Sequence, residues 1–152
     1  MSALRPRTSR LLALLAVLAL PAAWPPATAL EAGEGNPPGR VARSQFTSAV
    51  REREPVDRVQ VLTNDRRRIY FFTELHGLAG QTVTHRWAWR GRVMAEVRFP
   101  VGGPRWRVWS SKRLLPSWTG TWEVSVLDGQ GRVLHRERLR YVPAADPGAP
   151  SP

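Results

Sequence analysis

The segment Arg105–Leu114 reads RWRVWSSKRL and combines cationic, aromatic and hydroxyl side chains. Successive side chains of a strand point to opposite faces. One face is therefore expected to carry Arg105, Arg107, Trp109 and Ser111, and the other Trp106, Val108 and Ser110. Guanidinium groups grip carboxylate or phosphate through paired hydrogen bonds, and an indole is a platform for a sugar ring. The pattern predicts a ligand surface; in the alternative interpretation, arginine and tryptophan stack to cover a solvated sheet face.

Basic and aromatic neighbours extend this candidate surface. Lys112 and Arg113 continue the charge, and Trp118 is expected in a loop at the rim. A separate run, Arg66–Arg68, follows a turn and is either a solvated loop or a contact for anionic lipid or glycan phosphate.

His85 is the histidine whose neighbours say most about its role. It alternates with Val83, Trp87 and Trp89 on a mostly apolar strand face. That pattern favours a hydrogen-bonded histidine at the edge of the core, while a catalytic or ligand-binding role is the alternative. The complete set of candidate ligand-binding residues is Arg105, Arg107, Trp109, Ser111, Lys112, Trp118 and His85.

Several classes of chemistry are excluded or disfavoured by composition. The 152 residues contain no cysteine, which excludes thiolate ligation and a cysteine nucleophile, and three histidines leave little material for a metal site. No GxSxG, HExxH or phosphate-cradling glycine loop is present. We therefore predict no cofactor, no metal and no enzyme. The alternative is a cell-envelope hydrolase that uses His85 or a pair of carboxylates. Candidates for such a pair are Glu74, Glu96 and Glu123, which the sequence alone does not pair.

The N-terminus has the order of a secretory signal peptide. Three arginines precede the apolar run Leu11–Leu20, and Ala27-Thr28-Ala29 forms a small-x-small cleavage site. We predict cleavage after Ala29 and a periplasmic or secreted protein; an uncleaved membrane anchor is the minority interpretation, because the apolar stretch is short for a span. Without residues 1–29 the net charge falls from +11 to +8, since the segment holds three bases and no acid.

The remaining chain is predicted to contain one folded domain between a flexible linker and a disordered tail. Residues 30–42 read as a flexible linker and residues 143–152 as a disordered, proline-rich tail. Within residues 43–142, short alternating segments separated by turn signals predict a single antiparallel β-sandwich, immunoglobulin-like, of seven or eight strands. The expected strands are 45–52, 56–62, 68–75, 81–89, 92–101, 105–111, 119–127 and 132–142.

The stretch from Ala49 to Tyr141 resembles a bacterial family known as domain of unknown function 2914. Five pieces carry the resemblance, in the family's order: REPVDRV (53–59), IYFFTEL (69–75), GQTVTHRW (80–87), WRVWSSK (106–112) and WTGTWEVSVLDGQGRVL (118–134). The resemblance implies an all-β domain of the cell envelope and carries over no activity, ligand or catalytic residue.

Together these observations predict a non-catalytic periplasmic module. Its partner is expected to be an anionic cell-envelope component, such as a glycan or a lipid headgroup, or an envelope protein, bound through the arginine and tryptophan surface. Nucleic acid is disfavoured by the export signal, and no membrane span is expected after cleavage. The sequence leaves the oligomeric state open.

Overall fold

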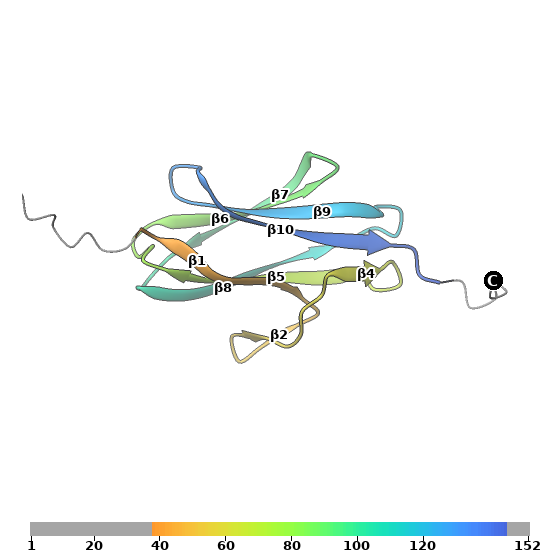
Figure 1. Cartoon of the computed structure of the whole chain (residues 1–152), viewed down its shortest axis with the longest axis horizontal. Coiled ribbons are helices and arrows are strands. Elements are labelled where there is room, and N and C mark those ends of the chain that lie inside the picture. Colours follow the sequence, from red (N-terminus) through yellow and green to blue (C-terminus); the bar gives the residue numbers. More distant parts are fainter. Residues whose placement is uncertain (1–37, 146–152) are drawn as a thin grey trace, which may run out of the picture. The chain divides into compact units, whose positions relative to one another are not determined.

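Ten β-strands make up the regular structure of the described residues, 38–145, in this computed structural model (Figure 1). The strands are β1 (Arg40–Thr47), β2 (Val50–Arg51), β3 (Glu54–Pro55), β4 (Val61–Thr63), β5 (Arg68–His76), β6 (Thr82–Trp89), β7 (Arg92–Pro100), β8 (Arg105–Arg113), β9 (Gly120–Leu127) and β10 (Val133–Val142). Residues 38–145 contain no helix, so the all-β prediction is confirmed. Accordingly, no apolar helix of membrane-spanning length occurs in this part of the chain.

The strands form two larger sheets and one small hairpin. One sheet has the order β1-β5-β8, the other the order β4-β10-β9-β6-β7, and β2 pairs with β3. Every pairing is antiparallel except that of β4 with β10, where Val61–Thr63 runs parallel to Arg140–Val142. The prediction of a purely antiparallel arrangement is wrong at this edge. The three-residue strand β4 lies on the long connection from β3 to β5. It adds to the edge of the second sheet by running parallel to β10.

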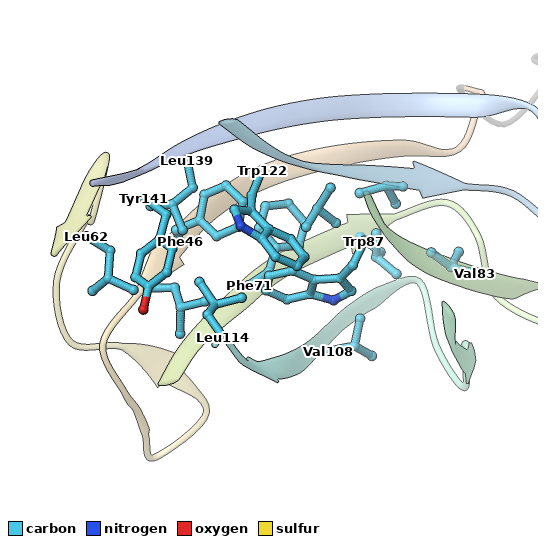
Figure 2. Close-up of a cluster of buried hydrophobic side chains, with 14 of the residues drawn as sticks. Phe46, Leu62, Phe71, Val83, Trp87, Val108, Leu114, Trp122, Leu139 and Tyr141 are labelled. Carbon is cyan, nitrogen blue, oxygen red and sulfur yellow. The ribbon is translucent and has the colours of Figure 1, made fainter. Parts of the chain in front are cut away.

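The inner faces of the two larger sheets enclose an aromatic core (Figure 2). Phe46 and Phe71 come from the three-stranded sheet, while Trp87 and Trp122 come from the five-stranded sheet, and all four are at most 1% exposed. The Phe46 ring lies 5.0 Å from Phe71 and 5.8 Å from Trp87, centroid to centroid, at tilted or edge-on angles that aromatic pairs favour. Burial of these large side chains stabilises a domain that has no disulfide.

Most of the strands lie where alternation and turn residues predict them. Arg90 and Gly91 have φ angles of 50° and 76° and close the predicted tight hairpin between β6 and β7. At the β9–β10 turn, the Asp128 carboxylate accepts hydrogen bonds from the backbone amides of Gln130 and Arg132. Local turn chemistry therefore fixes both hairpins.

The region before β5 differs from the prediction. The expected strands 45–52 and 56–62 are replaced by β1, the β2–β3 hairpin and the short β4. The Asp57 carboxylate accepts hydrogen bonds from Thr47 Oγ1 and from the amide and hydroxyl of Ser48. These bonds end β1 at Thr47 and turn the chain into the hairpin, because side-chain acceptors take the donors that a longer strand would use.

The structure also locates the first strand relative to the predicted linker. β1 begins at Arg40, three residues before the predicted domain start at residue 43. A Cβ on Gly39 would clash with the Leu78 side chain and the Gly77 carbonyl oxygen, so this glycine is required by close packing. The predicted signal peptide and most of the linker and of the tail lie outside the described residues.

Candidate functional site

The outer face of the three-stranded sheet carries the first four predicted binding residues. Along β8 the burial alternates, with Val108 and Ser110 buried and Trp109 36% exposed. Arg105 lies opposite His76 of β5, and Arg107 lies opposite Glu74. The face therefore combines Arg105, Arg107, Trp109 and Ser111 with side chains from the two neighbouring strands.

Glu74 is the centre of charge on this face. Its side chain is 5% exposed and accepts hydrogen bonds from Arg105 Nε at 3.0 Å, Arg105 Nη2 at 3.1 Å and Arg107 Nε at 3.2 Å. His76 Nε2 lies 2.9 Å from the same carboxylate. The hydrogen bonds from Arg105 lower the pKa of Glu74 to about 2, against the opposing effect of burial. The carboxylate is thus ionised and neutralises part of the predicted cationic surface.

The β2–β3 hairpin adds charge of both signs to this face. Glu54 forms ion pairs with Arg43 and with Arg107, whose Nη1 lies 3.0 Å from the Glu54 carboxylate. Its hydrogen bond with Arg43 lowers the pKa of Glu54. With Arg53, four guanidinium groups face two ionised carboxylates here, so the surface keeps an excess of positive charge.

Arg53 stands at the strained turn of that hairpin. Glu52 and Arg53 have φ angles of 49° and 64°, in the left-handed region that side chains with a Cβ disfavour. The turn places the Arg53 guanidinium 5.8 Å from the centre of the Trp106 ring. Arg53, Arg105 and Arg107 together line a pocket of about 150 Å³. We call this the triple-arginine pocket.

Sequence reasoning missed Arg53. The local sequence REREP has no Asn-Gly or Asp-Gly pair, which is the usual signal for this kind of turn. The spacing of Arg53 from Arg105 in the sequence gives no indication that they meet. A signal that points to the turn is Pro55, which interrupts the alternating pattern.

Lys112 and Trp118 lie apart from the triple-arginine pocket, contrary to the predicted grouping. Lys112 is on the inner side of β8, where Nζ donates to the carbonyl oxygen of Met94 at 3.3 Å and lies 6.0 Å from the Trp118 ring centre. Trp118 packs against Trp89 and Trp122 at centroid distances of 6.1 and 5.8 Å. Lys112 lies four positions after Val108, so strand alternation places both on the same side.

His85 is a fully buried core histidine, so it does not join the predicted binding surface. Its Nε2 lies 3.0 Å from Thr73 Oγ1, its Nδ1 lies 3.0 Å from Ser110 Oγ, and Trp87 Nε1 donates to the same serine at 2.9 Å. Burial lowers the pKa of His85 to about 3 and keeps the ring neutral. The ring holds two sheets together through neutral hydrogen bonds.

Residues 80–141 match the family described as Protein of unknown function (DUF2914). The resemblance to this family is thereby confirmed over this segment. The DUF2914 match covers β6 to β9 and nearly all of β10, and it includes Arg105 and Arg107. Arg43, Arg53, Glu54 and Glu74 lie outside it, so four of the six charged groups of this face come from the preceding part of the chain. A search of curated proteins finds no match to this chain.

A serine, a histidine and a glutamate meet between β1 and β10. Ser44 precedes the DUF2914 segment, and His135 and Glu137 belong to it. Ser44 Oγ lies 2.8 Å from His135 Nε2 and donates to Glu137 Oε2 at 2.6 Å. Glu137 lies 3.5 Å from the same His135 nitrogen. In a hydrolase triad the acid orients the histidine through its other nitrogen. This cluster lacks that relay, and Arg58 further engages the Glu137 carboxylate.

Glu54 and Glu74, the two carboxylates of this face, lack the raised pKa of a general acid. A glycosidase needs one carboxyl group whose pKa is raised so that it carries a proton. Glu54 and Glu74 both have lowered pKa values because arginines hold them. Among residues 38–145, no group of three or more histidine and acidic side chains is placed to hold a metal ion.

Proposed function

We propose that this domain is a non-catalytic periplasmic binding module for an anionic component of the cell envelope, built on an immunoglobulin-like β-sandwich. The observation that carries the proposal is the convergence of three guanidinium groups on the triple-arginine pocket. A pocket of about 150 Å³ matches a small anionic group such as a carboxylate or phosphate, not a whole cofactor. The leader predicted from the sequence supports the location.

The geometry of the hairpin supports binding as its purpose. Residues held at positive φ cost free energy, and such strain concentrates at functional positions. Here the strained turn carries Arg53, which lines the pocket together with Arg105 and Arg107. Arg53 forms no ion pair with any described residue, so its charge is free for a ligand.

Trp109 supports a ligand that also has an apolar face. Its indole is 36% exposed on the same side of β8 as Arg105 and Arg107. A sugar ring stacked on Trp109 with its carboxylate or phosphate in the triple-arginine pocket uses both features. An acidic segment of an envelope protein is the other anionic partner that this surface fits.

Co-sedimentation of the chain with isolated cell-wall sacculi across a salt series tests the proposal. We expect saturable binding that weakens as salt rises, because ion pairing with exposed guanidinium groups is screened. Arg53→Gln should weaken binding at least fivefold, and Trp109→Ala should weaken it further. Arg51→Gln is the matched control, since it removes one exposed charge from the same hairpin outside the pocket.

Two results contradict the proposal. Binding that does not change with salt removes its electrostatic basis. Equal losses for Arg53→Gln and Arg51→Gln show that general charge, not the pocket, is responsible. A third result changes the ligand but not the site. If the chain binds purified envelope proteins instead of sacculi, and Arg53→Gln abolishes that binding, the ligand is an acidic protein segment.

A further inference from the structure

The topology gathers several basic segments at one end of the domain. β4, β6, β8 and β10 all run toward this end, so the connections that follow them meet there (Figure 1). The segments are 63–68, 89–92 and 112–120, together with the exit of β10. They carry seven cationic side chains, of which the six arginines are exposed and Lys112 is half-buried. We call this group the basic end: Arg66, Arg67, Arg68, Arg90, Arg92, Lys112 and Arg113.

Hydrogen bonds fix these segments against one another. The Leu114 amide donates to the carbonyl of Arg67 at 2.8 Å, and Asn64 Nδ2 donates to the carbonyl of Pro116 at 3.3 Å. Trp89 Nε1 donates to the carbonyl of Thr119 at 3.1 Å. The arginines of one connection are therefore held beside the loop that carries Leu115 and Trp118.

Unlike most other cations of the described structure, those of the basic end form no ion pair within 4.0 Å. Ion pairs within residues 38–145 involve arginines 43, 58, 86, 105, 107, 132, 136 and 138, but none of the seven cations of the basic end. Asp65 is the single acid in the described residues of these segments. Positive charge is thus segregated at this end rather than spread evenly.

The basic end also presents apolar side chains. Leu114 is fully buried, but the next residue, Leu115, is 43% exposed, and Val93, which directly follows the segment 89–92, is 52% exposed. Trp89 and Trp118 are half-buried, and cations lie near both rings, with Arg90 4.8 Å from the Trp89 centre. Half-exposed tryptophans among cations, beside protruding aliphatic side chains, form the composition that suits a membrane–water interface.

We propose that the basic end docks on the surface of a bilayer that contains anionic lipid. Exposed cations near the membrane are attracted by the negative surface potential, and the attraction adds up over several residues. Leu115 and the Trp118 ring reach the headgroup region, while the fold stays outside the hydrocarbon core. This surface lies apart from the triple-arginine pocket, and the proposal stands independently of the sacculus ligand.

Flotation and sedimentation with unilamellar vesicles test the docking. Vesicles of phosphatidylcholine alone are compared with vesicles containing 30% phosphatidylglycerol, so the anionic lipid is the variable. The full chain is used in every case, so that any contribution of residues 1–29 is common to all variants. We expect Arg66→Gln/Arg67→Gln/Arg113→Gln to lower the partition onto anionic vesicles at least tenfold. The matched control, Arg40→Gln/Arg51→Gln/Arg98→Gln, removes the same charge elsewhere and should lower it less than threefold.

A site-specific probe reports the orientation. The chain has no cysteine, so Leu115→Cys and Gln130→Cys each give a single site for an environment-sensitive fluorophore. We expect a blue shift for the label at position 115 on anionic vesicles and none at position 130, in the turn between β9 and β10. Equal losses for both triple variants, or no shift at position 115, would overturn the proposal. Binding of soluble polyphosphate at an affinity equal to that for vesicles, without a shift, assigns the basic end to a soluble polyanion instead.

Discussion

At the scale of single residues, His85 shows how burial decides chemistry. Its ring contacts Thr73, Ser110 and the rings of Phe71 and Phe99, with centroids 5.1 and 4.9 Å away. A charged imidazole would lose its hydration there with no carboxylate to compensate. The neutral ring is therefore retained, and its hydrogen bonds contribute to stability.

This environment predicts a pH-dependent stability. The pKa of His85 falls from its ordinary 6.5 to about 3 on folding, so between these values the unfolded chain binds a proton that the folded chain does not. Stability from this residue is complete above pH 6.5 and falls by about 1.4 kcal/mol per pH unit as acid is added. We expect a loss of roughly 2 kcal/mol between pH 7 and pH 5, measured by urea unfolding.

The control is a variant that cannot titrate. In His85→Gln the loss of stability between pH 6.5 and pH 4.5 should largely disappear, whatever the variant's absolute stability. The same substitution at the half-exposed His135 should leave the loss in place. An unchanged slope in His85→Gln would show that another group causes it.

Glu74 gives the second prediction at this scale. Glu74→Gln removes a nearly buried charge that forms ion pairs with three arginines and should destabilise the fold by about 2 kcal/mol. The pKa of Glu74 is lowered to about 2, so its stabilisation is present above pH 4.5 and is lost as the pH falls through 2. Urea unfolding at pH 7 and at pH 2.5 should show a smaller difference between wild type and variant in acid. Glu96→Gln breaks an exposed ion pair with Arg86 and should cost less than about 1 kcal/mol; equal effects would contradict the role of burial.

At the level of elements, the turn of the β2–β3 hairpin lowers the stability of the domain and places a proposed binding residue, Arg53, at the pocket. Its turn residues Glu52 and Arg53 both occupy the left-handed region, where asparagine and glycine are preferred. Glu52→Asn/Arg53→Gly should stabilise the domain by about 1–2 kcal/mol and abolish the contribution of the pocket to sacculus binding. Thermal unfolding and co-sedimentation measure the two effects.

Glu52→Asn alone separates them. This single change should raise stability by about 0.5–1 kcal/mol and leave binding intact, because Glu52 makes no hydrogen bond or ion pair with the described residues. If the single change weakens binding as much as the double change, the conformation of the turn, not the Arg53 guanidinium, is what the ligand requires.

At the scale of the whole molecule, the segregated charge predicts an effect of salt on stability. Cations without acidic partners repel one another within a Debye length of about 10 Å at 0.1 M salt. Arg66→Gln/Arg67→Gln/Arg113→Gln should therefore raise the melting temperature at 10 mM NaCl by roughly 2–4 °C. The gain should shrink at 300 mM NaCl, where repulsion is already screened. A lower melting temperature in the variant would contradict this prediction. It would mean that the contacts of these arginines stabilise the basic end more than their mutual repulsion destabilises it.

Local features of the fold could be predicted from the sequence. The period of two along β8 fixed which side chains share a face, and the Arg90-Gly91 and Asp128–Arg132 turns marked their hairpins. The same alternation could have separated Lys112 from Arg107. These features are local, because strand geometry and turn conformation depend on residues a few positions apart.

The tertiary structure alone decided which distant residues meet. Arg53 reaches Arg105 and Arg107 because the hairpin folds over the sheet, and Glu74 neutralises part of the predicted surface because β5 lies between β1 and β8. The gathering of Arg66–Arg68 with Leu115 likewise depends on strand order. Strand order results from burying one shared core, a sum over contacts far apart in the chain that no short sequence window contains. The all-β class, the faces of the strands and the excess of arginine follow from composition and local pattern. Packing determined where that charge is neutralised and where it remains available.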